Sequence, residues 1–320
     1  MRRLGKSDIF VAPLALGCNV FGWTTDEKTS FEILDAFVDH GLNLIDTANI
    51  YSTWVPGNSG GESETIIGKW LKKSGKRNKV ILATKVGMEM AGSKGLKSVY
   101  IRKCLEDSLQ RLQTDRIDLY QAHKDDTETP LDETLEAFDQ LIKQGKVRAI
   151  GASNYEADRL ENALSISEKN QFFSYISLQP HYNLYDREVF ECSLEPVCVK
   201  NTMGVISYFS LAQGFLTGKY RSTSDLNKSQ RGNSIGRYLD ARGFNILKTL
   251  DTISHLYEVS PAAIALAWLI QRKSITAPIV SATTVTQLNE LVKSVKLHLS
   301  EKEITALDLA SSYTALPTRS

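Results

Sequence analysis

Cysteine is scarce in this sequence, and its spacing forms no recognisable site. The four cysteines include no CxxC pair, and four thiols in 320 residues are too few for the disulfide framework of a small secreted protein. Cys192 and Cys198 lie six residues apart in a segment with a helical pattern, which disfavours both a disulfide bridge and a metal site. We expect Cys18, Cys104, Cys192 and Cys198 to be buried or half-buried free thiols.

The sequence also lacks an excess of one charge and a long apolar run. It contains 38 basic and 37 acidic residues, so its net charge of +1 favours neither nucleic acid nor an anionic membrane as a partner. No apolar run approaches the roughly 20 residues that span a bilayer, and the first residues, MRRLGKSDIF, lack the apolar core of a signal peptide. We therefore predict a cytoplasmic protein that binds neither nucleic acid nor a membrane.

Several common cofactor and catalytic motifs are missing as well. No GxGxxG follows an early strand, so the sequence does not support a Rossmann site. GFLTGKY at 214–220 is one residue short of a P-loop and ends in Tyr220, where Ser or Thr would bind Mg²⁺. There is no GxSxG elbow. We predict no metal site, because no HExxH pair is formed by the histidines, which are His40, His123, His181, His255 and His298.

What the sequence does contain is a regular alternation of short apolar runs with amphipathic helical patterns. Hydrophobic residues make up 42% of the chain, which is enough for a large core. The runs are apolar without strict alternation, as expected of strands covered on both faces in a parallel sheet. One helix, AAIALAWLI after Ser260-Pro261, is apolar nearly all round and predicted to be buried. The apolar runs are 12–18, 42–48, 79–86, 116–123, 147–154, 175–180, 203–209 and 277–282.

The spacing of these runs favours a (β/α)8 TIM barrel. Each interval between run ends is long enough for a strand, a helix and two loops. Eight such units is the count of this barrel, whereas a doubly wound sheet usually has nearer six strands. We predict one α/β domain over residues 1–320, with a short N-terminal hairpin and long loops at the carboxyl ends of the strands, including a polar flap at 211–243. The run ends lie near Gly17, Asp46, Lys85, His123, Ser153, Gln179, Tyr208 and Ser281.

Three titratable residues lie at or just after three successive strand ends, namely Asp46, Lys85 and His123. Tyr51 follows Asp46 by five residues and so belongs to the loop after the same strand. Because the catalytic residues of a parallel barrel come from the carboxyl ends of its strands, we expect the four side chains to meet. The Lys85 ammonium would lower the pKa of the Tyr51 phenol, Asp46 would hold the lysine, and a neutral His123 would orient a carbonyl oxygen. Each residue alone has an ordinary structural role, but the four together indicate a site that protonates a carbonyl while a hydride is delivered.

A second candidate site follows the last predicted strand. SATTVTQLNEL at 281–291 turns from strand into helix, and we expect Thr284 to cap that helix with Gln287 as its capping-box partner. The amides and hydroxyls of Ser281, Thr283 and Thr284 at this helix N-terminus suit an anion, and phosphate sites after the last strands are common in this barrel. An ordinary capped helix is the alternative.

These segments together resemble the aldo-keto reductase family, whose members are NADP(H)-dependent (β/α)8 barrels that reduce aldehydes and ketones. The resemblance runs nearly end to end, from RRLGKSDIFVAPLALGC to SATTVTQL. IDTANIY, ATKV and LYQAHKDD match the family's aspartate-to-tyrosine segment, its lysine strand and its histidine strand. The resemblance implies a catalytic tetrad of Asp46, Tyr51, Lys85 and His123, with Tyr51 as the proton donor.

The resemblance also implies where NADP(H) binds. GASN and LQPHYN match the segments that hold the nicotinamide carboxamide, Tyr208 matches the aromatic residue that stacks on the nicotinamide ring, and FSLAQGFLTGKY matches the segment that wraps the pyrophosphate. The chain departs from the common pattern at Phe209-Ser210, which stands for Ser-Pro, at Thr283, where many members have Arg, and at Leu291, which is often Asn. The implied cofactor contacts are Asp46, Ser153, Asn154, Gln179, Tyr208, Phe209, Ser210, Leu211, Lys219, Arg231, Ser281, Thr283, Gln287 and Glu290.

The substrate is less determined than the cofactor. We expect Trp23, Trp54 and His123 to line the substrate pocket, although the two tryptophans could equally be packing residues. We expect a small-molecule carbonyl substrate, and the sequence leaves the oligomeric state open. The loops expected to form the pocket walls are 52–61, 87–95 and 211–243.

Two other functions stay open at this point. One is a cofactor-binding regulatory subunit with little turnover, because the chain also resembles potassium-channel β-subunits. The other is an aldolase-type barrel in which Lys85 attacks a carbonyl and forms a Schiff base.

Overall fold

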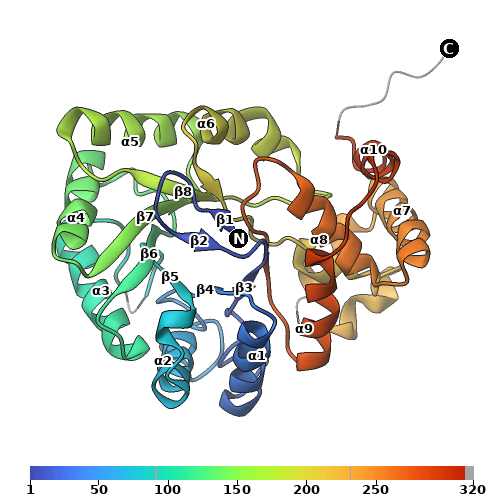
Figure 1. Ribbon diagram of the computed structural model, residues 1–320, viewed down its shortest axis with the longest axis horizontal. Coiled ribbons are helices and arrows are strands. Elements are labelled where there is room, and N and C mark those ends of the chain that lie inside the picture. The colour runs from blue at the N-terminus through green and yellow to red at the C-terminus, as the bar shows by residue number, and fades with distance from the viewer. Residues whose placement is uncertain (91, 231, 314–320) are drawn as a thin grey trace.

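The computed structural model describes residues 1–90, 92–230 and 232–313, and its central feature is one sheet of eight parallel strands (Figure 1). Neighbouring strands follow the order β10-β3-β4-β5-β6-β7-β8-β9, so each strand except β10 pairs with the next one along the chain. The eight predicted strands are confirmed as β3 (Ala15–Gly17), β4 (Leu44–Asp46), β5 (Ile81–Val86), β6 (Ile117–Ala122), β7 (Val147–Ser153), β8 (Tyr175–Gln179), β9 (Gly204–Val205) and β10 (Ile279–Val280).

Backbone hydrogen bonds between the first and last parts of this order close the sheet into a barrel. The Ala277 amide donates to the Val205 carbonyl oxygen over 3.2 Å, and the Ile279 amide donates to the Ser207 carbonyl oxygen over 2.8 Å. The Thr276 hydroxyl also accepts a bond from the Val205 amide at 3.1 Å. Closure leaves no unpaired sheet edge, and it confirms the predicted (β/α)8 barrel.

Helices surround the sheet, as Figure 1 shows, because the strands are apolar on both faces and need cover on the outside. One hydrophobic cluster fills the layer between strands and helices, and a second, smaller cluster lies inside the barrel. The helices are α1 (Glu27–Asp39), α2 (Glu62–Ser74), α3 (Ser98–Leu112), α4 (Leu131–Lys143), α5 (Ala157–Asn170), α6 (Glu195–Lys200), α7 (Ala241–Tyr257), α8 (Pro261–Gln271), α9 (Val285–Val292) and α10 (Glu301–Ala310).

The predicted N-terminal hairpin is present as the antiparallel pair β1 (Arg2–Arg3) and β2 (Phe10–Val11). Leu4, Ile9 and Val11 are buried and belong to the cluster inside the barrel, together with Leu44 and Leu119. The hairpin therefore covers the amino-terminal end of the barrel, and the carboxyl ends of the strands lie at the other end.

The predicted buried helix and the predicted flap are both found. Ser260 caps α8 by accepting a hydrogen bond from the Ala263 amide at 3.3 Å, and all nine residues of 262–270 are buried. The described part of 211–243 is a long connection with short 3₁₀ turns until α7 begins at Ala241. Within the described residues, no single helix is long and apolar enough to cross a membrane; only α7 and α8 taken together, bent by 95° at their break, would meet that length and composition.

Candidate active site

The carboxyl ends of the strands surround a cavity of about 1010 Å³. Parallel pairing places Gly17 beside Asp46, Lys85 beside Gln121, and Ser153 beside Gln179. Parallel register therefore brings polar side chains from β4, β5, β6, β7 and β8 to one end of the barrel, although 133 positions separate Asp46 from Gln179. The cavity is thus in the place where this fold carries its catalytic residues.

The four predicted catalytic side chains meet at the floor of this cavity. The Lys85 ammonium donates to Asp46 Oδ2 at 2.7 Å, to the Thr47 carbonyl oxygen at 2.7 Å and to Tyr51 Oη at 3.1 Å. The rings of Tyr51 and His123 are edge to face, with centroids 5.9 Å apart. Asp46, Tyr51 and His123 line the cavity, whereas Lys85 lies behind them and is fully buried.

A single carboxylate fixes the loop that carries Tyr51. Glu62, at the start of α2, accepts hydrogen bonds from the backbone amides of Ser52 at 3.2 Å and Ser59 at 2.8 Å. The Gly61 amide donates to the Tyr51 carbonyl oxygen at 2.9 Å, and Gly61 has a left-handed φ of 84°. The backbone of the loop is therefore held at both ends, and the Tyr51 backbone with it.

The expected direction of the Tyr51 pKa is wrong. Burial raises the pKa of the phenol above its ordinary value, and the nearby Lys85 ammonium offsets this only in part. Burial alone would lower the pKa of Lys85, but the Asp46 charge and the hydrogen bonds to Asp46 and Tyr51 outweigh that effect, so the lysine pKa is raised. At neutral pH the site therefore holds a protonated phenol beside a charged ammonium.

His123 is neutral, as expected. Burial, followed by the nearby Lys85 charge, lowers the pKa of His123 well below its ordinary value. Its Nδ1 atom is buried and has no hydrogen-bond partner among the described residues, and its backbone carbonyl oxygen accepts a bond from Asn154 Nδ2 at 2.8 Å. Because His123 lines the cavity and is neutral, its imidazole can share a hydrogen bond with a molecule there without bringing a positive charge.

The neutral His123 should make folding stability depend on pH in mild acid. Its pKa is lower in the folded protein than the value of about 6.5 expected in the unfolded chain, so between the two values only the unfolded chain binds the proton. The corresponding stability is fully present above pH ~6.5 and is lost as the pH falls below it, by up to about 1.4 kcal/mol per pH unit.

Urea unfolding at several pH values measures this effect. The His123→Gln variant should lose less stability between about pH 6.5 and pH 5 than the wild type, while the exposed His255→Gln control should follow the wild type. Identical pH slopes for the wild type and His123→Gln would show that His123 is not held neutral.

Two amides that contact Asp46 complete the floor of the site. Asp46 Oδ1 accepts from Gln179 Nε2 at 2.9 Å and from Gln121 Nε2 at 3.2 Å. Gln179 was expected to contact the cofactor, and it does line the cavity. Its amide also donates to Asp46, a member of the tetrad. Sequence reasoning missed Gln121, although a buried polar residue in the apolar run LYQA is a visible signal.

The other predicted nicotinamide contacts gather on the neighbouring wall. The Ser153 hydroxyl donates to the Gln179 carbonyl oxygen at 2.9 Å, and Asn154 Oδ1 accepts from Tyr208 Oη at 2.7 Å. The Tyr208 ring stacks on His181, with centroids 5.2 Å apart and planes 21° from parallel. Ser153, Asn154, Gln179 and Tyr208 all line the cavity, as do Phe209, Ser210 and Leu211.

Left-handed backbone at residues other than glycine is concentrated at this cavity and at helix ends. Asn154, Phe209 and Gln213 have φ values of 54°, 52° and 57°, and all three line the cavity. Such a conformation costs about 1–3 kcal/mol and persists where the surrounding contacts enforce it. The Asn183 side chain holds Phe209 by donating to its carbonyl oxygen at 3.0 Å. The surrounding contacts therefore hold this wall of the cavity in one strained conformation.

The predicted anion site lies at the far end of the same cavity. Thr284 caps α9 by accepting from the Gln287 amide at 3.1 Å. The expected reciprocal partner is displaced by one residue, because Gln287 Oε1 accepts from the amide and hydroxyl of Thr283, at 2.9 Å each, and not from Thr284. Ser281 bonds to Asn19 at 2.8 Å. Lys219, Ser281, Thr283, Gln287 and Glu290 line the cavity, while Arg231 lies outside the described residues.

Two tryptophans form an aromatic wall beside Tyr51. The rings of Trp54 and Tyr51 are 5.8 Å apart, and those of Trp23 and Trp54 are 5.6 Å apart at 85°. Trp23 Nε1 also donates to Gln230 Oε1 at 2.9 Å, which links the first barrel loop to the flap. Both tryptophans line the cavity, as expected of pocket residues.

Sequence reasoning missed other residues of the cavity wall. Backbone position, rather than a motif, brings these residues to the cavity, since they lie in loops that follow strands or, for Thr286, in the first turn of α9. They include Asn19, Val20, Thr24, Lys124 and Thr286. The loops 87–95 and 211–243, which were expected to form the pocket walls, do line the cavity, through Met88, Gln213, Gly214, Thr217, Lys228, Ser229 and Gln230.

The contacts of Lys85 argue against a Schiff base. Its ammonium already donates to three oxygen acceptors, is fully buried and does not line the cavity. A raised pKa keeps it charged, whereas a nucleophilic lysine must be neutral.

The cysteines and histidines add no further site. Cys18, Cys104 and Cys198 are buried free thiols, but the expectation fails at Cys192, which is exposed on the π-helical turn before α6. No group of His, Cys, Asp and Glu within the described ranges could hold a metal ion.

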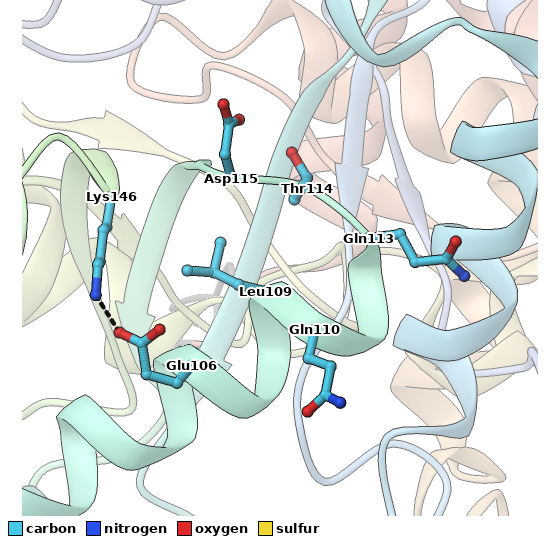
Figure 2. A pocket seen from close by; sticks show the side chains of 7 residues that line it. All are labelled: Glu106, Leu109, Gln110, Gln113, Thr114, Asp115 and Lys146. Carbon is cyan, nitrogen blue, oxygen red and sulfur yellow. Dashed lines mark hydrogen bonds and ion pairs between the residues drawn. The ribbon is translucent and has the colours of Figure 1, made fainter.

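A second hollow, of about 600 Å³, is shallow and lies beside the end of α3, at the amino-terminal end of the barrel. Figure 2 shows that Glu106 and Lys146 pair with each other there, while Gln110, Gln113 and Asp115 point in different directions. It therefore offers no convergent set of functional groups.

Comparison with known proteins agrees with this geometry. A sequence profile described as the Aldo/keto reductase family matches residues 13–311. The chain is 39% identical to the uncharacterized oxidoreductase YrpG of Bacillus subtilis over 310 residues, which cover 94% of this chain and 92% of the relative.

Two further relatives carry reductase names. The aldo-keto reductase YhdN of Bacillus subtilis is 34% identical, covering 83% of this chain and 78% of its own. The norsolorinic acid reductase of Aspergillus flavus is 30% identical, covering 96% and 80%. The chain therefore belongs to the Aldo/keto reductase family, an oxidoreductase family that generally uses NAD(P)H.

Proposed function

We propose that this protein reduces small aldehydes or ketones to alcohols with NADP(H), and that Tyr51 donates the proton. The observation that carries this proposal is the Tyr51 hydroxyl in the cavity wall, 3.1 Å from the ammonium of a buried Lys85–Asp46 pair and beside a neutral imidazole. An acid, a charge partner and a neutral hydrogen-bonding group at one point are the parts that carbonyl protonation requires.

The cavity fits a dinucleotide in both size and chemistry. Its volume of about 1010 Å³ is at the upper end for small-molecule sites. Ser153, Asn154 and Gln179 offer amide and hydroxyl groups that suit a carboxamide, and Tyr208 offers an aromatic face. When bound, the nicotinamide supplies the hydride. At the other end, Lys219 and the N-terminus of α9 suit phosphate groups.

The residues of the tetrad would act as follows. Tyr51 holds its proton at Oη, because burial raises its pKa, and transfers it to the carbonyl oxygen as negative charge develops there. The Lys85 ammonium stabilises the resulting phenolate, and Asp46 keeps that ammonium charged and in place. A ring N–H of neutral His123 orients the carbonyl oxygen.

A preference for NADP(H) over NAD(H) rests on the far end of the cavity. Lys219 lines it and is the main candidate for the extra phosphate, while Lys228, which also lines it, pairs with Asp225 at 2.8 Å. The acidic Glu290 is ion-paired with Lys293 at 2.6 Å. One charge-assisted contact to the extra phosphate would contribute about 1.5–3 kcal/mol, or roughly 10- to 100-fold in affinity.

A panel of carbonyl compounds assayed with NADPH and with NADH tests the proposal. Loss of reduced-cofactor absorbance should follow the addition of an aldehyde, and kcat/KM should be at least about tenfold higher with NADPH. Cofactor binding without turnover on any carbonyl would contradict the proposal and favour a regulatory subunit. Equal or faster turnover with NADH would contradict the NADP(H) assignment alone.

A further inference from the structure

Lys124 is a charged residue of the cavity wall that has no role in the proposed reaction. It directly follows His123, beyond the end of β6, and it lines the same cavity as Tyr51. Its side chain is exposed and forms no hydrogen bond or ion pair with any residue in the described ranges. The two acids that follow it are otherwise engaged: Asp125 pairs with Arg159 at 2.7 Å, and Asp126 accepts from the Leu96 amide at 2.7 Å.

Other charges in the cavity wall are neutralised or lie elsewhere. Asp46 is paired with Lys85, and Lys228 pairs with Asp225 at 2.8 Å. Lys219 lies over the Tyr220 ring, 5.1 Å from its centroid, in the segment after β9 at the proposed phosphate end. Lys124 is thus an uncompensated cation beside the tetrad, next to the residue that orients the carbonyl oxygen.

Aromatic and apolar side chains also line the cavity close to the tetrad. Trp54 contacts Tyr51, Trp23 contacts Trp54, and Met88 from the loop after β5 lines the same space. A molecule that places a carbonyl at Tyr51 therefore meets an apolar surface and an ammonium on a flexible stem that reaches into solvent.

We propose that this site selects carbonyl compounds that carry an anionic group, with a carboxylate as the simplest case, on an apolar or aromatic body, and that Lys124 binds the anion. This inference rests on the proposed function for the reaction itself. It adds the substrate class, because neutral carbonyl compounds leave the Lys124 charge without a partner in the complex.

Two aldehydes with the same aromatic body separate the charge from the rest of the molecule: 4-formylbenzoate and its methyl ester, which is neutral and larger by one methyl group. We expect Lys124→Gln to lower kcat/KM for 4-formylbenzoate, relative to the ester, by about tenfold, and Lys124→Glu to lower it further by like-charge repulsion. High salt should reduce the wild-type preference for the acid. Lys169→Gln, an exposed lysine of α5 with no contact to the cavity, should keep the wild-type ratio.

The ratio of the two substrates is the deciding quantity. An unchanged ratio in both Lys124 variants, or an equal loss on both aldehydes, would overturn the role of Lys124. Calorimetric titration of both aldehydes into the cofactor-loaded protein keeps the inference testable without turnover. If the wild type reduces neither aldehyde but binds 4-formylbenzoate through Lys124, the proposed reaction fails and the anion site stands.

Discussion

Replacing Tyr51 with phenylalanine is expected to lower kcat for carbonyl reduction by about 100- to 10,000-fold while leaving cofactor affinity nearly unchanged. The substitution removes only the hydroxyl that lies 3.1 Å from the lysine ammonium. Its ring contacts with Trp54 and His123 stay possible, and Lys85 keeps Asp46 and the Thr47 carbonyl oxygen as acceptors. The fold and the cofactor wall should therefore survive.

Steady-state kinetics and a cofactor titration by fluorescence would measure the two quantities separately. Tyr257→Phe is a matched control, because that hydroxyl bonds to Glu303 on the outside of the barrel, at 2.7 Å. It should reduce carbonyl compounds at the wild-type rate. A Tyr51→Phe protein with substantial activity would refute the assignment of Tyr51 as the proton donor.

Lys85→Met should both inactivate the protein and destabilise it, by about 3–5 kcal/mol in the free energy of unfolding. Lys85 is fully buried and Asp46 nearly so, at 3% exposure. Without the ammonium, the Asp46 carboxylate is a buried charge whose remaining partners within the described part of the chain are the amides of Gln121 and Gln179. Such a charge costs far more than the loss of an ion pair on the surface.

The double variant Asp46→Asn/Lys85→Met separates the two causes. It should recover part of the stability, since no unpaired charge stays buried, but it should not recover activity. Lys69→Met, which breaks the exposed 2.6 Å pair with Glu27, should change stability by no more than about 1 kcal/mol. Urea midpoints and slopes provide the measurement. A double variant no more stable than Lys85→Met would contradict a buried Asp46 charge as the cause.

The sequence predicted the positions of the tetrad because parallel strands order their carboxyl ends. Once the strands were recognised, Asp46, Lys85 and His123 had to lie at one end of the barrel. The direction of the Tyr51 pKa could not be predicted in the same way, because it depends on how much water surrounds the phenol. The residue types indicated that Lys85 would lower the pKa of Tyr51, but they did not indicate that burial of the phenol raises this pKa by more.

Contacts between distant segments also could not be predicted from the sequence. Gln121 lies 75 positions from Asp46, and its role depends on which face of β6 points inward. The capping partner of α9 was displaced by one residue, because Thr283 rather than Thr284 presents its amide to Gln287. The single-domain organisation, the cytoplasmic location and the absence of macromolecular partners stay predictions.

The Glu62 carboxylate has a consequence for how such a protein can change over evolution. Because it holds Ser52 on one side and Ser59 on the other, we expect changes between them to leave the Tyr51 backbone in place as long as Asn58 keeps its bond to the Ser52 carbonyl oxygen. That stretch carries Trp54, which is 45% exposed and faces the space beside the tetrad. Insertions and substitutions there can change the substrate preference, while the catalytic residues and the reaction stay the same.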